Sequence, residues 1–169
     1  MTDTIKGSGY TSSMIRTVVA IDSQRGMADE QGIPWDIPGD KKYFVDQLQS
    51  GLVLMGYGTY LEVRQPFGKS PNYVATTRNE TLRDGFVAIS NPVEFSLQAT
   101  EDVWNIGGAG LLATTMDTLD ELYITQLEGE FGCTKFFPPY QEDFELSAEE
   151  PPITENGITY RYQIWRRRQ

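Results

Sequence analysis

The residue best suited to chemistry in this 169-residue chain is Asp40, which lies between two aromatic side chains. Trp35 precedes Asp40 in a proline-flanked segment, and Phe44 follows it by about one helical turn. Proline disfavours helix at the residue before it, so we expect an extended segment and a helix that begins near Asp40. A carboxylate with apolar neighbours could bind a flat ligand that carries N–H donors. A helix-capping aspartate is the alternative interpretation.

Two glycine-containing segments could bind a phosphorylated ligand. Gly56 follows the apolar run Leu52–Met55, and the run Gly107–Gly110 follows Val103–Ile106. Glycine after a strand lets a ligand approach the backbone, and the start of the next helix offers free N–H groups to a phosphate. The glycine cluster lacks the full dinucleotide fingerprint, so a tight turn is an equally good interpretation.

Composition excludes several function classes. The net charge of −10 argues against nucleic-acid and anionic-membrane partners, and no apolar run is long enough to span a bilayer. The chain has no histidine, which excludes Ser-His-Asp and Cys-His catalysis and zinc sites that need imidazole. The single cysteine, Cys133, cannot form an internal disulfide and fits a reducing compartment. We therefore expect a cytoplasmic, monomeric protein with no metal.

Strands that alternate with short helices must position these residues, and this pattern predicts an α/β fold around a mostly parallel sheet. Strands are expected at residues 15–22, 52–56, 72–77, 85–90, 103–106 and 121–128. Helices are expected at residues 40–50, 91–100 and 111–116 and from residue 57.

The two ends of the chain differ in pattern from its middle. Residues 144–147 and 159–165 alternate as in an antiparallel hairpin, joined by turns at Pro151–Pro152 and Asn156–Gly157. Residues 23–32 are polar and predict a long loop of the kind that often serves function. Residues 1–13 are expected to be a disordered extension, and residues 14–169 a single domain.

From Met14 to Arg168 the order of motifs resembles the dihydrofolate reductase family. The motifs that carry the resemblance are Trp35–Asp40 with Phe44, Ile106–Ala109, Leu122–Thr125 and Thr134–Pro138. It implies a three-layer fold with a twisted, mostly parallel eight-stranded sheet, flanking helices and a C-terminal antiparallel hairpin. It also implies a cis peptide in the glycine pair. The implied reaction reduces 7,8-dihydrofolate to 5,6,7,8-tetrahydrofolate by hydride transfer from NADPH.

The resemblance also implies roles for residues. Asp40 would hold the 2-amino and ring N–H edge of the pterin, with a pKa raised by its apolar surroundings. Thr125 would share its hydrogen-bond network, and Trp35 would order a water. The other implied substrate-binding residues are Val18, Val19, Ile33, Phe44, Val63, Phe67, Lys69 and Ile106. The implied cofactor-binding residues are Ala20, Met27, Gly32, Ile33, Gly56, Gly58, Thr59, Thr76, Thr77, Arg78, Ile106, Gly107, Gly108, Ala109, Gly110, Leu111, Leu112 and Thr134.

Several positions depart from the family pattern. Tyr57 and Gly110 stand where the family usually has basic residues, which leaves Arg78 to recognise a 2′-phosphate. Ser70 stands where a guanidinium normally binds the glutamate tail, and Lys69 beside it could act as a point charge. We therefore expect weaker binding of dihydrofolate, or a different pterin-like substrate.

Two other readings of the sequence remain open. The first is a reductase of the same fold that acts on another substrate, such as a pyrimidine intermediate of flavin synthesis. Asp40 argues against that substrate, and Ser70 argues mildly for it. The second is a non-catalytic nucleotide-binding module. In addition, Leu112 replaces an aromatic hydroxyl residue near the nicotinamide, and altered sensitivity to diaminopyrimidine antifolates is a further expectation.

Overall fold

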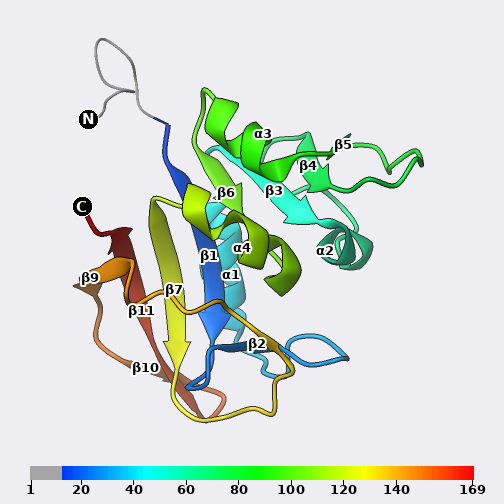
Figure 1. Ribbon diagram of the computed structural model, residues 1–169. Coiled ribbons are helices and arrows are strands. Elements are labelled where there is room, and N and C mark those ends of the chain that lie inside the picture. The colour runs from blue at the N-terminus through cyan, green and yellow to red at the C-terminus, as the bar shows by residue number, and fades with distance from the viewer. Residues whose placement is uncertain (1–12) are drawn as a thin grey trace.

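A twisted, mixed sheet of nine strands runs through residues 13–169, the part of the chain that the computed structural model describes (Figure 1). In spatial order its strands are β10 (Ile153–Glu155), β11 (Ile158–Arg167), β7 (Glu121–Leu127), β1 (Ile15–Ile21), β6 (Val103–Asn105), β3 (Leu52–Gly56), β4 (Asn72–Ala75) and β5 (Phe86–Ile89). The remaining strand, β9 (Phe144–Glu149), also pairs with β11. The strands from β7 to β5 are parallel, and β11 runs antiparallel to β7.

Helices cover both faces of this sheet and make it the middle of three layers (Figure 1). The helices are α1 (Pro38–Gln47), α2 (Tyr57–Glu62), α3 (Pro92–Gln98) and α4 (Ala109–Thr115), and α4 continues into the short 3-10 helix η1 (Met116–Thr118). No helix among residues 13–169 is both long enough and apolar enough to cross a membrane. The architecture confirms the expected α/β class.

The first strand, β1, divides the core in two because its successive side chains point to opposite faces of the sheet. Ile15 and Ile21 pack in one cluster with Leu112 of α4. Val18 packs in a second cluster with Leu48, which directly follows α1. A run of β-branched residues suits a strand that is buried on both faces, and β1 occupies such a position beside β6 and β7.

The structure differs from the sequence-based expectation at several boundaries. The polar stretch 23–32 was expected to be loop throughout, but β2 (Gly26–Ala28) pairs with β8 (Lys135–Phe136) to form a separate small sheet. The C-terminal hairpin contains three strands, because residues 153–155 form β10 and turn back into β11 at Asn156–Gly157. This extra strand raises the count above the expected eight.

Two further boundaries shift by a few residues. Helix α1 begins at Pro38, since proline is favoured in the first turn, and it ends three residues before the expected residue 50. Ser13 is buried, and its hydroxyl donates to the carbonyl of Ala99 at 3.0 Å. The rest of the expected extension, residues 1–12, lies outside the described residues.

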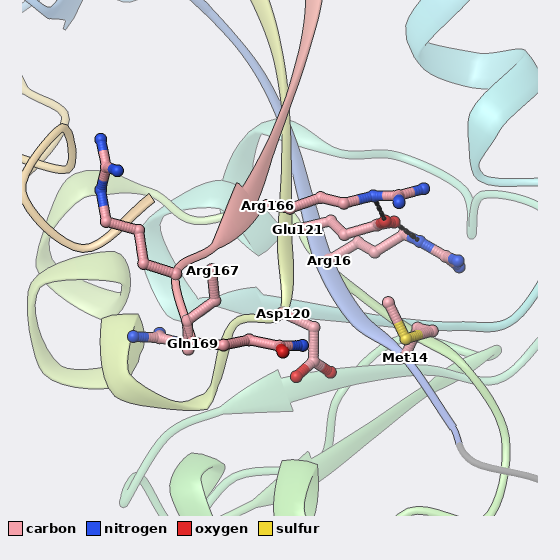
Figure 2. Close-up of a pocket in the computed structure, with 8 residues that line it drawn as sticks. Met14, Arg16, Asp120, Glu121, Arg166, Arg167 and Gln169 are labelled. Atoms are coloured by element: carbon pink, nitrogen blue, oxygen red, sulfur yellow. Dashed lines mark hydrogen bonds and ion pairs between the residues drawn. The ribbon is translucent and has the colours of Figure 1, made fainter. Parts of the chain in front are cut away.

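A row of charges crosses the sheet at the amino end of its central strands (Figure 2). Glu121 of β7 accepts from Arg16 Nε of β1 at 2.8 Å and from Arg166 Nε of β11 at 2.9 Å. These residues are direct cross-strand neighbours. A pocket of about 590 Å³ opens beside the row. Ion pairs therefore stabilise this end of the sheet, and Asp40 is not part of this row of charges.

Candidate active site

The segment that precedes α1 brings Asp40 against the sheet. Trp35 and Ile37 are buried in a cluster with Leu127 of β7 and Tyr160 of β11. Helix α1 then starts at once, with Asp40 in its first turn. The hydroxyl of Thr125, near the carboxyl end of β7, donates to Asp40 Oδ1 at 2.7 Å. The two residues are 85 positions apart in the chain. The structure thus brings Asp40 and Thr125 together as the resemblance implies.

Among residues 13–169, no cationic side chain is paired with the carboxylate of Asp40. Burial raises the pKa of Asp40 above its usual value, the hydrogen bond from Thr125 opposes this effect, and the negative charge of Glu155 adds to it. The neighbouring Lys41 pairs instead with Asp36 at 2.9 Å on the exposed side of the helix. A partly buried carboxylate of this kind can still accept hydrogen bonds from the N–H donors of a ligand.

An apolar wall includes Phe44, which follows Asp40 by about one turn of α1. Five of the residues expected to contact the substrate belong to one hydrophobic cluster: Val18, Phe44, Val63, Phe67 and Ile106. The rings of Phe44 and Phe67 meet edge to face, with centroids 5.6 Å apart. The elements that bear this wall are β1, α1, the segment after α2 and the end of β6. A flat apolar ligand bound by Asp40 would therefore contact aromatic and aliphatic side chains.

The backbones at the carboxyl ends of β3 and β6 lie close together, and glycines occupy the point of contact. The N–H of Gly56 donates to the carbonyl of Gly107 at 2.7 Å, and the Gly107–Gly108 peptide is cis, as the resemblance implies. A Cβ on Gly56 would lie 3.6 Å from that carbonyl oxygen, and one on Gly108 would lie 3.8 Å from Thr59 Oγ1. Helices α2 and α4 start directly after Gly56 and Gly108 without a side-chain cap.

The backbone at Gly56, Gly58, Gly107, Gly108 and Gly110 is called the glycine surface below. Apolar side chains line one side of it, and its outer side is open. A Cβ on Gly107 would lie 3.1 Å from Leu112 Cδ1 and 3.7 Å from Met27 Cε. A Cβ on Gly58 or Gly110 would meet no atom within 4 Å. Leu111 contributes a contact 3.7 Å from the Cβ position of Gly56. The structure therefore brings several of the residues expected to contact the cofactor together at these glycines, and two of them, Gly107 and Leu112, are buried.

Two buried residues that the sequence analysis missed support the glycine turn. Asn105 Oδ1 accepts from the N–H of Gly107 at 3.1 Å, and its amide group donates to Thr115 Oγ1 at 2.9 Å. Thr115 in turn donates to the carbonyl of Leu111 at 2.7 Å. An asparagine two residues before a glycine pair was the available signal, since asparagine commonly bonds nearby backbone.

Asp22, also missed, holds the loop after β1. It is buried and accepts from the backbone N–H groups of Gly26 at 2.8 Å, Gln24 at 2.9 Å and Phe131 at 3.0 Å. Burial alone would raise the pKa of Asp22, but these N–H donors and the thiol of Cys133 hold it below its usual value. Asp22 thus ties the loop that contains β2 to the segment between β7 and β8.

The residues expected at the 2′-phosphate lie beyond the end of β4. The guanidinium of Arg78 lies 4.4 Å from the ring centroid of Tyr57, and its backbone N–H donates to Thr76 Oγ1 at 3.0 Å. Thr77 and Arg78 are exposed. Tyr57, which replaces an expected basic residue, therefore contacts Arg78 through its aromatic face.

The remaining predicted residues divide among the loops and the core. Ile33 is 65% exposed, and Gly32 before it has a φ of 115°. Thr134 is exposed and donates to Glu30 Oε1 at 2.9 Å. Val19 packs in the cluster of α4, and Ala20 packs in the cluster of Trp35.

Lys69 does not join the group around Asp40. Its Nζ forms an ion pair with Glu101 Oε1 at 2.8 Å, and the two side chains are 60% and 51% exposed. Glu101 lies just before the amino end of β6. Ser70, which precedes a cis bond to Pro71, is exposed beside Lys69.

Comparisons with known proteins agree with this geometry. Residues 14–167 match the family model described as dihydrofolate reductase. The dihydrofolate reductase of Staphylococcus aureus strain Mu50 is 35% identical over 133 residues, which cover 78% of this chain and 82% of that relative. The dihydrofolate reductase of Bacillus subtilis strain 168 is 26% identical over 154 residues, which cover 89% and 92%. The chain belongs to the dihydrofolate reductase family.

Proposed function

We propose that this protein is an oxidoreductase that converts 7,8-dihydrofolate to 5,6,7,8-tetrahydrofolate, with NADPH as its cofactor. The observation that carries the proposal is Asp40. Its carboxylate is partly buried and accepts a hydrogen bond from the Thr125 hydroxyl at 2.7 Å. Phe44, one helical turn further along α1, belongs to the same apolar wall as Ile106. The relatives that match the chain are named for this reaction.

On the substrate side, Asp40 would accept two hydrogen bonds from the 2-amino group and the adjacent ring N–H of the pterin. The hydrogen bond from Thr125 fixes the orientation of the carboxylate before the substrate binds. Less conformational entropy is therefore lost when both oxygens bind the pterin. The raised pKa of Asp40, caused first by burial, favours a proton at this end of the site. We propose that a water held near Trp35 carries a proton to the ring nitrogen that is reduced.

The glycine surface fits a dinucleotide cofactor. Gly56, Gly107 and Gly108 carry no side chain of their own at this approach, and a Cβ on Gly58 or Gly110 would meet no atom within 4 Å. NADPH, when bound, would supply the hydride. Met27 and Ala109 would adjoin the nicotinamide and pyrophosphate, whereas Leu112 is buried in the core. Thr76, Thr77 and Arg78 would contact the 2′-phosphate.

A second candidate function is reduction of a pterin without a glutamate tail. Ser70 supplies no cation, and Lys69 is engaged by Glu101, so a tail carboxylate must displace that ion pair to bind.

For dihydrofolate itself, we propose Lys69 as the tail contact through this exchange. Because a lysine is a point charge, the contact would be weaker than one made by a bidentate guanidinium.

The test is the loss of NADPH absorbance on adding dihydrofolate, repeated with NADH and with a tail-less dihydropterin. Turnover with dihydrofolate and NADPH at a KM in the low micromolar range, about the lower end of common values, supports the proposal. Equal kcat/KM with the tail-less pterin favours the second candidate. Tight NADPH binding with no turnover on either pterin would overturn both.

We also propose that the protein acts as a monomer in the cytoplasm. The single cysteine and the net charge of −10 support this expectation. Light scattering of the purified protein measures the mass directly, and a mass near twice 19.1 kDa would contradict it.

A further inference from the structure

The carboxylate of Glu155 reaches the start of α1 from the C-terminal hairpin. The backbone N–H of Gly39 donates to Glu155 Oε1 at 3.0 Å and to Oε2 at 3.3 Å, across 116 positions of the chain. Ile37, at the N-cap position, provides no side-chain hydrogen bond to the helix. The first N–H groups of a helix need such acceptors, and a charged acceptor is favoured there. Glu155 therefore supplies the missing cap.

We propose that Glu155 is a positioning residue for Asp40, fixing the first turn of α1 and placing a second negative charge beside the carboxylate that binds the pterin. The inference rests on the proposed function, in which Asp40 holds the substrate. It adds a residue from β10, a strand that contributes none of the substrate or cofactor contacts proposed above.

The packing around Gly39 shows how close the hairpin lies to the helix. A Cβ on Gly39 would lie 2.8 Å from Glu155 Oε1 and 3.4 Å from the hydroxyl oxygen of Tyr160. That hydroxyl donates to Glu155 Oε1 at 3.4 Å. Next in the chain, Asn156 donates its amide group to the carbonyl of Asp36 at 2.9 Å. The hairpin thus bonds the backbone on both sides of Ile37, so movement of β10 would move Asp40.

The electrostatic surroundings of Asp40 give Glu155 its second effect. Thr125 of β7 donates its hydroxyl to Asp40, and Tyr43 of α1 and Tyr160 and Tyr162 of β11 are near enough to feel its charge. Burial raises the pKa of Tyr43 to about 12 and also raises those of Tyr160 and Tyr162, so these hydroxyls are neutral at physiological pH. Among the described residues, the charge that acts on Asp40 from another element is that of Glu155.

A negative charge at Glu155 favours a bound proton on Asp40 or on the pterin that Asp40 holds. The charge acts in the same direction on both members of this Asp40–pterin pair. Reduction needs this proton, so the activity falls as the pH rises through the apparent pKa of the pair. With Glu155 charged, the fall occurs at higher pH.

The first experiment measures the pH profile of kcat/KM for dihydrofolate in Glu155→Gln. Glutamine has the same shape and can still accept from Gly39, but it carries no charge. We expect an unchanged low-pH plateau and a descending limb at lower pH, with activity on that limb reduced about two- to fivefold. Glu155→Ala should also raise KM at every pH, because it removes the cap.

The matched control is Glu128→Gln, which removes one exposed carboxylate just after β7, three residues from Thr125. Its pH profile should equal that of the wild type. A Glu155→Gln profile that coincides with both would overturn the proposal. An equal loss at every pH would overturn the electrostatic part and leave only a structural role.

A second readout separates this inference from the proposed function. The carboxyl carbon of labelled Asp40 can be titrated by 13C NMR in the ligand-free protein, with Asp40→Asn identifying its signal. Glu155→Gln should lower the midpoint of that titration, and an unmoved midpoint would contradict the inference. Full activity in Asp40→Asn would instead contradict the proposed function.

Discussion

Two buried or partly buried carboxylates lie at opposite ends of the same sheet, and their partners differ. Glu121, at the amino end, is 5% exposed and lies between the guanidinium groups of Arg16 and Arg166. Asp40, toward the carboxyl end, has a hydroxyl as its hydrogen-bond partner. The same functional group therefore stabilises the fold where cations neutralise it, and can bind a ligand where they do not.

The difference has a consequence for stability. The folded state raises the pKa of Asp40, mainly by burial, so the folded protein binds the proton more tightly than the unfolded chain. Stability from this group is thus present below its ordinary value of 3.8 and falls as pH rises through the raised folded value. At neutral pH the ionised Asp40 destabilises the fold, in contrast to a carboxylate between two arginines.

The largest expected effect comes from Asp40→Asn. We expect kcat/KM for dihydrofolate to fall about 100- to 10,000-fold, because the variant cannot hold or exchange the proton. NADPH affinity should be unchanged, and the melting temperature should rise slightly at pH 7, since an uncompensated charge is removed. Steady-state kinetics, NADPH titration and thermal unfolding provide the three measurements.

The cofactor titration is the control for that variant. Loss of NADPH binding would show that Asp40 contacts the cofactor or supports its surface. A lower melting temperature would show that the carboxylate stabilises the fold, and the contrast between the two ends of the sheet would then disappear.

Glu121→Gln tests how much the carboxylate at the amino end of the sheet contributes to stability. It leaves Arg16, with a side chain 19% exposed, without one of its two carboxylate partners. Breaking a buried ion pair costs about 3–5 kcal/mol, and the exposure of Arg166 brings our expectation to about 2–3 kcal/mol of unfolding free energy. Urea denaturation measures this loss. The kcat of the folded variant should remain that of the wild type, and a large fall in kcat would refute the separation of the two regions.

Asp22→Asn tests a third kind of partner, the backbone N–H group. Asp22 accepts three such donors, and we expect the variant to lose about 1–2 kcal/mol of unfolding free energy at pH 7. The pKa of Asp22 is lowered on folding by these donors, so its stabilisation is present above 3.8 and lost below it. The difference between variant and wild type should shrink as the pH falls below 3.8. A difference that is constant with pH would refute the charge argument.

The smallest effect is expected for Lys69→Met. Its ion pair with Glu101 is more than half exposed, so the unfolding free energy should change by less than about 1 kcal/mol. If Lys69 binds the glutamate tail, KM should rise severalfold for dihydrofolate and stay constant for a tail-less pterin. Equal changes for both substrates would contradict a role in tail recognition.

Much of the fold and the central residue of the site could be predicted from local patterns. The β-branched run of β1, the apolar run of β3 and the segment from Trp35 to Phe44 each carry their signal within a few residues. Asp40 stood out because it lies at a helix start between the aromatic residues Trp35 and Phe44. Its closeness to Thr125 followed from the family resemblance and is present in the structure.

The rest depended on contacts between distant segments. Glu155 caps α1 from 116 residues away, and no local pattern links a glutamate at the end of a short strand to Gly39. The strands β2 and β8 contain three and two residues, too few for an alternating pattern. The ion pair of Lys69 with Glu101 depends on a loop conformation that composition does not determine.

The order of the strands has a consequence for synthesis on the ribosome. β1 emerges first among the strands, yet its partners are β6, from Val103, and β7, which ends at Leu127. At common translation rates its two edges stay unpaired for roughly 5–20 s. Nascent chains that end before Val103 expose an apolar strand with neither neighbour, which is the state that chaperones bind and that aggregates. Rapid synthesis of the middle of the chain should therefore raise the yield of folded protein.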